Sequence, residues 1–431
     1  MLYSNLQINE KGHLCIGGVD TIALAQQYGT PLYVMDKDRV RENCRTYLGA
    51  MRKYFGDECL PFYASKALCF TDICRLVKEE GLGLDVVSLG ELYTAKAADF
   101  PMERVGFHGN NKTDLDISEG IRLGVGHFVV DADEEIDRIE ELAGKAGVCQ
   151  KVLLRVGPGI DPHTHAKIAT GMVDCKFGAA IETGAAMELT KKILRCKNIA
   201  FEGYHCHVGS QIFDAGAFVS AVDIMLGFMA GVMDETGYIA KVLNLGGGFG
   251  VRYTEDDPKM NVEKIIHMVA EHLDIKRAEY GLPRLVIYME PGRSIVADAG
   301  ITLYTVGTVK KIPGYTNYVS VDGGMADNPR YTLYEAKYTF LNAEKADEKA
   351  NLICSVAGRC CESGDLLGEN VLLAEPARGD ILAVLTTGAY NFSMASGYNR
   401  LARPALVWVE KGQSRIAVRR QSLEDLLAQD L

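Results

Sequence analysis

The sequence predicts an α/β protein, with a (β/α)8 TIM-type barrel and a C-terminal β-rich domain that also recruits the N-terminal segment. Between residues 40 and 297, short apolar β-prone runs alternate with amphipathic helical segments. Eight such runs occur, which is the number that closes a barrel. After residue 298 the helical segments largely stop, and strand-like runs follow one another. A doubly wound open sheet is the alternative, but no GxGxxG motif opens the first helix.

The N-terminal segment, residues 1–39, contains two β-like pieces, His13–Ile16 and Pro31–Met35. Thr21–Tyr28 between them is expected to be a short helix, with Asp20 or Thr21 as its cap. We expect this segment to join the C-terminal β-rich domain. The predicted domains are therefore residues 1–39, the barrel at 40–297, and the β-domain at 298–431.

The barrel region supplies the strands and most of the helices. The predicted strands are Leu60–Tyr63, Leu84–Val87, Val105–His108, His127–Val130, Val152–Val156, Phe201–Cys206, Val242–Leu245 and Leu285–Glu290. The predicted helices are Ser88–Ala98, Asp114–Leu123, Asp133–Ala146, Ala185–Arg195, Ala217–Thr236 and Val262–Tyr280.

The C-terminal domain is expected to be built from strands and to end in a short amphipathic helix, Ser422–Gln429. The predicted strands are Ile301–Lys311, Tyr315–Asp322, Leu352–Ala357, Ile381–Thr386, Ala405–Val409 and Arg415–Arg419.

Composition narrows the function. The 431 residues carry a net charge of −11, which argues against nucleic acid and anionic membranes as partners. No apolar run is expected to approach the roughly 18 residues that span a bilayer, and the N-terminus lacks the order of a signal peptide. Twelve cysteines without a CxxC pair indicate reduced thiols and a cytoplasmic location, and give little support for structural zinc.

Lys66 is the first residue that points to chemistry. It follows the apolar run Leu60–Tyr63, and no acidic residue lies within five positions on either side. Active sites of barrels lie at the C-terminal ends of the strands. A lysine in this position is either a member of a buried ion pair or an amine that reacts with carbonyl compounds.

Glycines after the seventh run indicate an anion site. Gly246, Gly247 and Gly248 let backbone N–H groups approach an anion without interference from Cβ atoms. The same glycines would also suit a tight turn between a strand and a helix. Gly292-Arg293 and Ser210 offer further donors, so the set together favours a phosphate site.

Two further stretches allow competing interpretations. His205 and His207 have the spacing of metal ligands in barrel hydrolases, but His207 could instead lie flat against a planar group. Glu290 could pair with Arg293, or it could keep a pyridine nitrogen protonated. A lysine amine, a phosphate cradle, a flat histidine and a carboxylate for a ring nitrogen together indicate pyridoxal 5'-phosphate, with no metal.

Six motifs occur along the chain in a fixed order. They are Tyr63-Ala64-Ser65-Lys66-Ala67, His207-Val208-Gly209-Ser210-Gln211, Gly246-Gly247-Gly248, Glu290-Pro291-Gly292-Arg293, Cys361-Glu362-Ser363-Gly364-Asp365 and Gly388-Ala389-Tyr390. In these motifs the chain resembles the fold type III, alanine-racemase-like pyridoxal-phosphate decarboxylases, most closely the diaminopimelate decarboxylases. The resemblance covers essentially the whole chain.

This resemblance implies roles for individual residues. Lys66, Cys361, His207 and Glu290 would be catalytic, with Cys361 as the proton donor and Cys360 as a bystander. The cofactor would be bound by Lys66, His207, Ser210, Gly247, Gly248, Glu290, Pro291, Gly292, Arg293 and Tyr390. The substrate would be bound by Arg293, Arg330, Tyr334, Glu362 and Tyr390.

The resemblance also implies a reaction and an assembly. The expected reaction is decarboxylation of meso-2,6-diaminopimelate to L-lysine and CO2, the final step of lysine biosynthesis. The expected assembly is a homodimer in which Cys361 and Glu362 come from the partner chain.

Substrate choice rests on finer features. Asp161–His165, Thr170-Gly171 and Lys176–Gly178 resemble diaminopimelate enzymes, whereas Tyr331-Thr332 stands where many relatives have Pro-Ala. The alternative substrates are carboxynorspermidine, ornithine, arginine or a carrier-bound glutamyl group. Two further alternatives are a catalytically inactive binding regulator and a metal-dependent hydrolase using His205 and His207.

Overall fold

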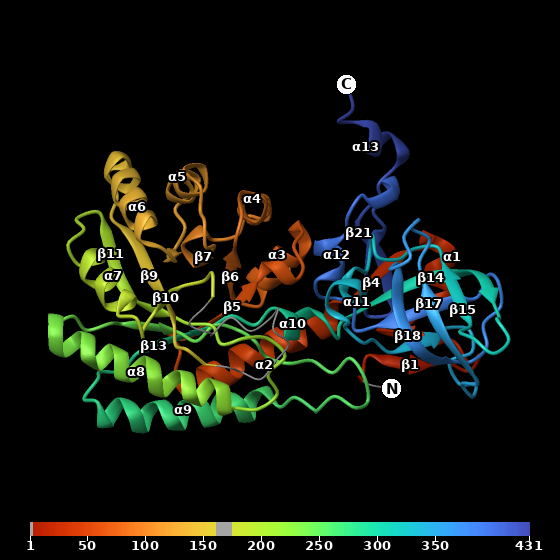
Figure 1. Ribbon diagram of the computed structural model, residues 1–431, viewed down its shortest axis with the longest axis horizontal. Helices are drawn as coiled ribbons and strands as arrows, with labels where there is room; N and C mark the ends of the chain where they lie inside the picture. The colour runs from red at the N-terminus through yellow and green to blue at the C-terminus, as the bar shows by residue number, and fades with distance from the viewer. Residues whose placement is uncertain (1–2, 161–174) are drawn as a thin grey trace. The chain divides into compact units, whose positions relative to one another are not determined.

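The structure is a computed structural model that describes residues 3–160 and 175–431. The chain divides into two compact units (Figure 1). One, the β-rich unit, comprises Met1–Asn43, Val251–Lys259 and Arg293–Leu431; the other, the barrel unit, comprises Cys44–Gly250 and Met260–Gly292. The motifs Asp161–His165 and Thr170-Gly171 lie outside the described residues.

The barrel unit contains eight parallel strands that close on themselves. They are β5 (Leu60–Ala64), β6 (Gly83–Val86), β7 (Val105–Phe107), β8 (His127–Val130), β9 (Gln150–Gly157), β11 (Ile199–His205), β12 (Val242–Asn244) and β13 (Val286–Met289). Within the described residues the order is β9-β11-β12-β13-β5-β6-β7-β8, and β8 also pairs with β9. The predicted barrel is confirmed, and each strand lies where a run was predicted. A two-residue strand, β10 (Ala179–Ala180), adds to β9.

Helices follow most of the strands. They are α2 (Lys37–Phe55), α3 (Thr71–Glu79), α4 (Leu89–Ala97), α5 (Asp114–Leu123), α6 (Asp133–Ala146), α7 (Ala185–Ile193), α8 (Gly216–Thr236) and α9 (Val262–Glu279). The sequence analysis did not predict α2 or α3. The boundary between the two units falls between residues 43 and 44, inside α2, so this charged, amphipathic helix has one part in each unit.

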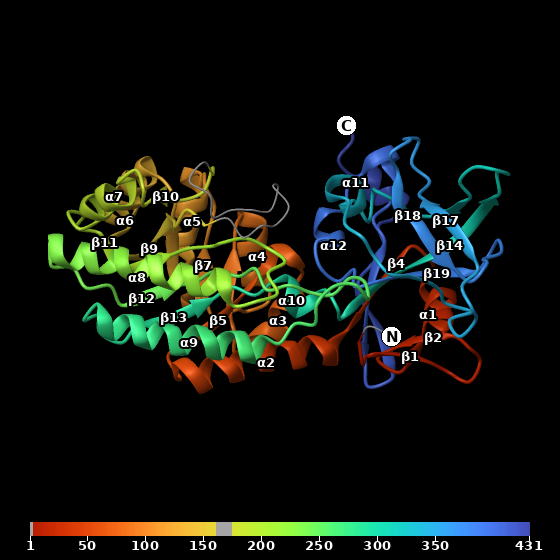
Figure 2. The same ribbon diagram turned by 60° about the horizontal axis from the view of Figure 1, so that its bottom comes forward.

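Helix α8 corrects one expectation from composition. By length and apolar content alone it could cross a membrane, so the expectation that no stretch approaches this length is wrong. Eight of its residues are buried, spaced so that they share faces of the helix. It lies alongside α9 in both views (Figures 1 and 2), and this packing is typical of a core helix.

The β-rich unit is built on a second sheet. Its strand order is β18-β17-β15-β14-β4-β20-β21, and β19 joins β14 to β16. The strands are β4 (Leu32–Asp36), β14 (Gly300–Lys310), β15 (Tyr318–Val321), β16 (Phe340–Asn342), β17 (Leu352–Ala357), β18 (Leu366–Leu373), β19 (Ile381–Leu385), β20 (Ala405–Glu410) and β21 (Gln413–Val418). Strands β16 and β18 were not predicted.

The N-terminal segment belongs to this sheet, as predicted. Strand β4 lies between β14, to which it is antiparallel, and β20, to which it is parallel. Residues Leu14, Ile16 and Leu24 pack in one apolar core with residues of β14, β19 and β20. A small sheet of β1 (Leu6–Ile8), β2 (Leu14–Ile16) and β3 (Val19–Asp20) precedes helix α1 (Thr21–Tyr28), which Asp20 caps through the N–H of Ile22.

Short helices complete the β-rich unit. They are α10 (Arg293–Val296), α11 (Arg330–Tyr334), α12 (Asn391–Met394) and α13 (Leu423–Leu427). Arg293 and Arg330 each begin one of them. Tyr390 immediately precedes α12.

Candidate active site

The C-terminal ends of the barrel strands bring together five polar side chains, which we call the barrel cluster. Asp85 lies on β6, His108 follows β7, His205 ends β11, Asn244 ends β12 and Glu290 follows β13. All five are buried. Parallel strands that close a barrel present their C-terminal ends at one face, which is why residues far apart in sequence meet here.

Glu290 is the centre of the barrel cluster. One carboxylate oxygen lies 2.9 Å from Nε2 of His108 and accepts a 2.6 Å hydrogen bond from Nδ2 of Asn244. The other oxygen lies 3.0 Å from Nε2 of His205. Asn244 is itself oriented, because its Oδ1 accepts from the N–H of Gly246 at 2.9 Å. Three side chains therefore hold the carboxylate in one orientation.

The charges in this cluster follow from burial and from neighbours. Burial alone would raise the pKa of Glu290, but His108 and His205 outweigh it and hold that pKa well below the ordinary value. Burial lowers the pKa of His205 to about 4, and burial raises the pKa of Asp85 to about 6 despite the nearby His108. Asp85 and Glu290 together raise the pKa of His108 against burial. Glu290 is accordingly ionised at neutral pH.

Lys66 lies in a single 3-10 turn, Ser65–Ala67, directly after β5. Its side chain is exposed, whereas the residues on either side, Ser65 and Ala67, are buried. Its positive charge lowers the pKa of Asp85 and of Glu91, although burial dominates both. The amine therefore stands beside the barrel cluster with access to small molecules.

His207 lies beyond the end of β11 and is fixed by a glycine loop. The N–H of Gly247 donates to its Nδ1 at 3.2 Å, which leaves Nε2 as the protonated nitrogen. Burial, with the charges of Lys66 and Arg155, holds the pKa of His207 well below its usual range. A neutral, oriented imidazole is suited to lie against an aromatic ring.

The glycines permit close approach of three loops. A side chain at Gly247 would collide with the carbonyl of Glu290, and one at Gly248 would collide with the carbonyl of Gly209. Gly292 is similarly close to Ala64, where an added Cβ would lie 2.9 Å from the Ala64 Cβ. These contacts require glycine at each position, and they leave a cradle of backbone without side chains that fits a phosphate group.

The histidines form a different set from the one considered for a metal. His205 and His207 were weighed as a ligand pair on one strand face, but β11 ends at His205, so strand alternation does not govern His207. The structure instead gathers His108, His205 and Glu290, whose ligand atoms all lie within 4.8 Å of one another. Within this set, both imidazoles already contact the carboxylate of Glu290.

The β-rich unit contains a second polar group, which we call the arginine–tyrosine cluster: Arg293, Arg330, Tyr253, Tyr338 and Tyr390. Nη1 of Arg293 donates to Oη of Tyr253 at 2.8 Å, and Nη1 of Arg330 donates to the same oxygen at 3.1 Å. Nη1 of Arg330 also contacts Oη of Tyr338 at 3.0 Å. The Tyr390 ring lies 4.8 Å from the Arg293 guanidinium and 5.8 Å from that of Arg330.

Local structure positions Arg330 and Tyr390. Arg330 follows the loop of Asp327, whose side chain accepts from the N–H of Gly324 at 3.0 Å and from the hydroxyl of Tyr304. Tyr390 has a φ of 66°, a left-handed conformation that is rare and strained for a tyrosine and is typical of functional sites. Tyr334 lies one turn after Arg330 on α11 and is half-buried.

Cys361 and Glu362 lie in a loop of the same unit, and both side chains are exposed. The N–H of Cys361 donates to Asn399 at 2.7 Å. The adjacent Cys360 is buried, and burial raises the pKa of its thiol to about 11. The two adjacent thiols therefore differ in solvent exposure: Cys361 is exposed and Cys360 is buried.

Sequence reasoning missed Asp85, His108, Asn244, Tyr253 and Tyr338 as members of these clusters. His108 lies at the end of a predicted strand, so its position was a usable signal. Asn244 lies two positions before the glycine run that starts at Gly246. Tyr253 and Tyr338 offered no such signal, because only the fold brings them to the arginines.

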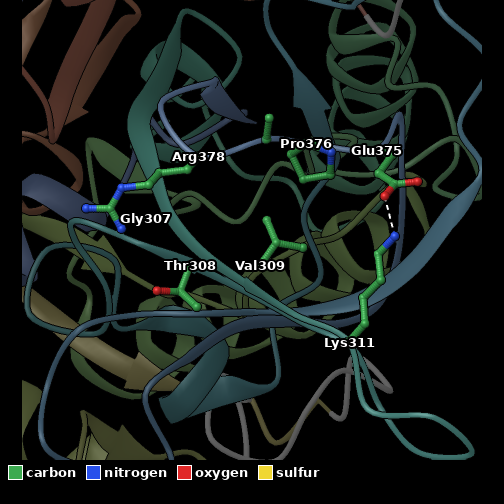
Figure 3. A pocket seen from close by; sticks show the side chains of 8 residues that line it. Gly307, Thr308, Val309, Lys311, Glu375, Pro376 and Arg378 are labelled. Carbon is green, nitrogen blue, oxygen red and sulfur yellow. Dashed lines mark hydrogen bonds and ion pairs between the residues drawn. The ribbon is translucent and has the colours of Figure 1, made fainter.

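The surface also carries a pocket elsewhere in the β-rich unit (Figure 3). It is lined by Gly307, Thr308, Val309, Lys311, Glu375, Pro376, Ala377 and Arg378. Lys311 and Glu375 form an ion pair across it. None of the predicted site residues lines this pocket, so it is not a candidate active site.

Comparisons with known proteins support the family that the motifs indicated. The family described as "Pyridoxal-dependent decarboxylase, pyridoxal binding domain" matches residues 38–297. The diaminopimelate decarboxylase of Bacillus subtilis is 45% identical over 100% of this chain and 98% of its own length. That of Staphylococcus aureus is 41% identical over 99% of each chain.

Solved structures agree. The diaminopimelate decarboxylase from M. jannaschii in co-complex with L-lysine superposes with a TM-score of 0.91 at 35% identity, over 99% of this chain and 98% of that one. The barrel, the barrel cluster and these full-length similarities lead to one conclusion: the chain belongs to the diaminopimelate decarboxylase family of pyridoxal-dependent decarboxylases.

Proposed function

We propose that this chain decarboxylates meso-2,6-diaminopimelate at its D-centre, giving L-lysine and CO2, with pyridoxal 5'-phosphate attached to Lys66. The observation that carries the proposal is the ionised, three-fold anchored carboxylate of Glu290 in the barrel cluster. The full-length similarity to diaminopimelate decarboxylases supports the substrate. The product, L-lysine, is bound in the related M. jannaschii structure.

The cofactor, when bound, supplies an electron sink for the pair of electrons released with CO2. Glu290 holds a proton on the ring nitrogen, because an ionised carboxylate at that nitrogen favours its protonated form. His207, neutral and oriented by Gly247, packs against the ring. The loops of Gly246–Gly248 and Pro291-Gly292, with Ser210, Arg293 and Tyr390, hold the phosphate.

The distal end of the substrate is assigned to the β-rich unit. Arg293, Arg330 and Tyr334 bind the distal carboxylate, and Glu362 binds the distal amino group. Tyr390 contributes to both cofactor and substrate. A buried site of this kind rejects an amino acid that lacks the matching group, because its own polar groups would be left unpaired.

Cys361 delivers the proton that replaces the lost carboxylate. Its exposure, set against the burial of Cys360, supports the assignment. We further propose that Cys361 and Glu362 act in the site of a partner copy, so that the working unit is a homodimer. A cytoplasmic location and a place at the end of lysine biosynthesis follow from the same proposal.

Cofactor attachment and substrate choice can be tested on the holoenzyme. Borohydride reduction is expected to fix the cofactor to the peptide that contains Lys66, and a Lys66→Ala protein is expected to retain none. CO2 release is expected to be fastest with meso-diaminopimelate. Cofactor attached to a lysine other than Lys66, or faster CO2 release from ornithine than from meso-diaminopimelate, would contradict the proposal.

Mixing two inactive variants tests the shared site. Lys66→Ala and Cys361→Ala proteins are each expected to be inactive, whereas Cys360→Ala keeps activity. When the two inactive proteins are mixed and allowed to exchange chains, activity is expected to return, because one site per mixed dimer is intact. No recovery in a mixture proven to exchange would place Cys361 and Lys66 in the same chain's site.

A further inference from the structure

Tyr253 is the point where the two buried arginines meet. Its phenol oxygen lies 2.8 Å from Nη1 of Arg293 and 3.1 Å from Nη1 of Arg330. It comes from the segment Val251–Lys259, which directly follows the glycine run of the barrel in sequence but belongs to the β-rich unit. No role was assigned to this residue from the sequence.

The backbone and the ring of Tyr253 are both anchored. The N–H of Tyr253 donates to Oδ2 of Asp257 at 2.8 Å, and its carbonyl accepts from Oγ1 of Thr339 at 2.8 Å. Its ring packs edge-on against Tyr338, with centroids 5.2 Å apart and ring planes at 90°. A side chain anchored in this way fixes the position of its hydroxyl.

The chemistry of this contact is unusual. A phenol has one O–H and two lone pairs, and here two guanidinium groups that never lose their charge both donate to it. The two cations lower the pKa of Tyr253 below its usual range, although burial opposes them. Arg330 contacts two phenol oxygens, that of Tyr338 at 3.0 Å and that of Tyr253 at 3.1 Å. Of these two phenols, only Tyr253 has a lowered pKa, because burial raises the pKa of Tyr338.

We propose that Tyr253 is a positioning residue that sets selectivity for a substrate with a distal carboxylate. Two cations repel one another, and a single acceptor oxygen fixed between them directs one N–H of each toward the same point. This geometry prepares both guanidinium groups to bind one carboxylate. The inference rests on the proposed function and deepens it by naming what organises the carboxylate site.

Binding is then linked to a proton. When the substrate carboxylate brings its negative charge to the arginines, an ionised Tyr253 takes up one proton from solvent and becomes a neutral phenol. Affinity for the dicarboxylate substrate therefore falls as pH rises through the Tyr253 pKa, because the proton must then be taken from a more dilute source. A phenylalanine at this position removes that dependence.

The first test compares Tyr253→Phe with Tyr28→Phe, whose hydroxyl contacts Ser414 in the same unit away from the arginines. For Tyr253→Phe, KM for meso-diaminopimelate is expected to rise about tenfold or more, with kcat changed much less. The kcat/KM for D-lysine, which lacks the distal carboxylate, is expected to be unchanged. The rise of KM with pH is expected in wild type and in Tyr28→Phe, and to be absent in Tyr253→Phe.

A second readout does not depend on turnover. The near-ultraviolet absorbance of the holoenzyme is expected to show one tyrosine that ionises below the usual pH range. This tyrosinate signal is expected to be missing in Tyr253→Phe. In wild type it is expected to decrease when pimelate is added. Identical spectra for both proteins, or equal losses with meso-diaminopimelate and D-lysine, would overturn the role of Tyr253. A wild type that binds pimelate in this way but does not release CO2 from meso-diaminopimelate would refute the proposed function instead.

Discussion

The barrel cluster and the arginine–tyrosine cluster both bury charged groups, but the buried charge has the opposite sign in each and is compensated by different partners. In the barrel cluster, a buried anion, Glu290, is surrounded by His108, His205 and Asn244. In the arginine–tyrosine cluster, buried cations are partnered by phenols. Burying a charge is costly unless partners offset it.

This difference assigns different roles to the two clusters. The barrel cluster is complete within the protein, which suits a group that must keep one charge state throughout a reaction. The arginine–tyrosine cluster gains most from an added anion, which suits a group that binds and releases a substrate carboxylate. Damage to the first should appear in kcat, and damage to the second in KM.

The largest effect is expected from Glu290→Gln. The amide keeps the shape and can still contact the neighbours, but it has no charge to hold a proton on the cofactor nitrogen. We expect kcat to fall about a thousandfold, the size of effect seen when a preorganised electrostatic group is removed. Steady-state CO2 release measures it. A Glu290→Gln variant with normal kcat and raised KM would contradict the catalytic role that distinguishes the barrel cluster from the arginine–tyrosine cluster.

Arg330→Lys is expected to be the complementary change. Lysine keeps the charge but cannot contact Tyr253 and Tyr338 with a planar fork. We expect KM for meso-diaminopimelate to rise by about tenfold to a hundredfold, the worth of one or two charged hydrogen bonds, while kcat changes less. A fall in kcat alone would contradict a binding role.

His205→Leu sharpens the comparison through pH. Removing His205 removes one of the causes that hold the pKa of Glu290 down, so that pKa rises. Because the proposed mechanism requires ionised Glu290, activity lost as pH falls should be lost at a higher pH than in wild type. The pH profile of kcat measures the shift. An unchanged acid limb would show that His205 does not control Glu290.

The smallest effect concerns stability rather than catalysis. His127 begins β8 and is buried, and burial lowers its pKa to about 3, against about 6.5 when unfolded. Between those values the unfolded chain binds the extra proton, so stability falls as pH falls below 6.5. From pH 6.5 to 4.5 this group alone removes about 2–3 kcal/mol.

His127→Phe should therefore lose less stability than wild type over that interval, because phenylalanine cannot be protonated and can still pack between Phe62 and Tyr288. Thermal unfolding of both proteins at the two pH values provides the comparison. Parallel losses would exclude His127 as a source of acid sensitivity.

Sequence patterns predicted most of the fold but less of the chemistry of the site. All eight barrel strands were predicted because buried parallel strands are apolar runs between amphipathic helices. Helix α2 was missed, since its charged sequence spans the place where a domain boundary was expected. Strand β18 was missed because half-exposed edge strands carry a weak apolar signal.

The site shows the same limit more sharply. Glu290 was singled out, but its ionisation depends on His108, which reaches it only through closure of the barrel. Arg293 was singled out as a donor beside Gly292, and Arg330 by resemblance, but the phenol that joins them follows a glycine run with no motif of its own. Local motifs identify reactive residues, whereas their charge states depend on distant partners.

The most direct test of the account compares meso-diaminopimelate with D-lysine in the wild-type holoenzyme. Both offer the same D-centre and the same distal amine, but D-lysine lacks the carboxylate assigned to the arginine–tyrosine cluster. We expect kcat/KM to favour meso-diaminopimelate by roughly 10⁴, the discrimination of a buried site built for a polar group. Comparable kcat/KM values for the two substrates would contradict the account.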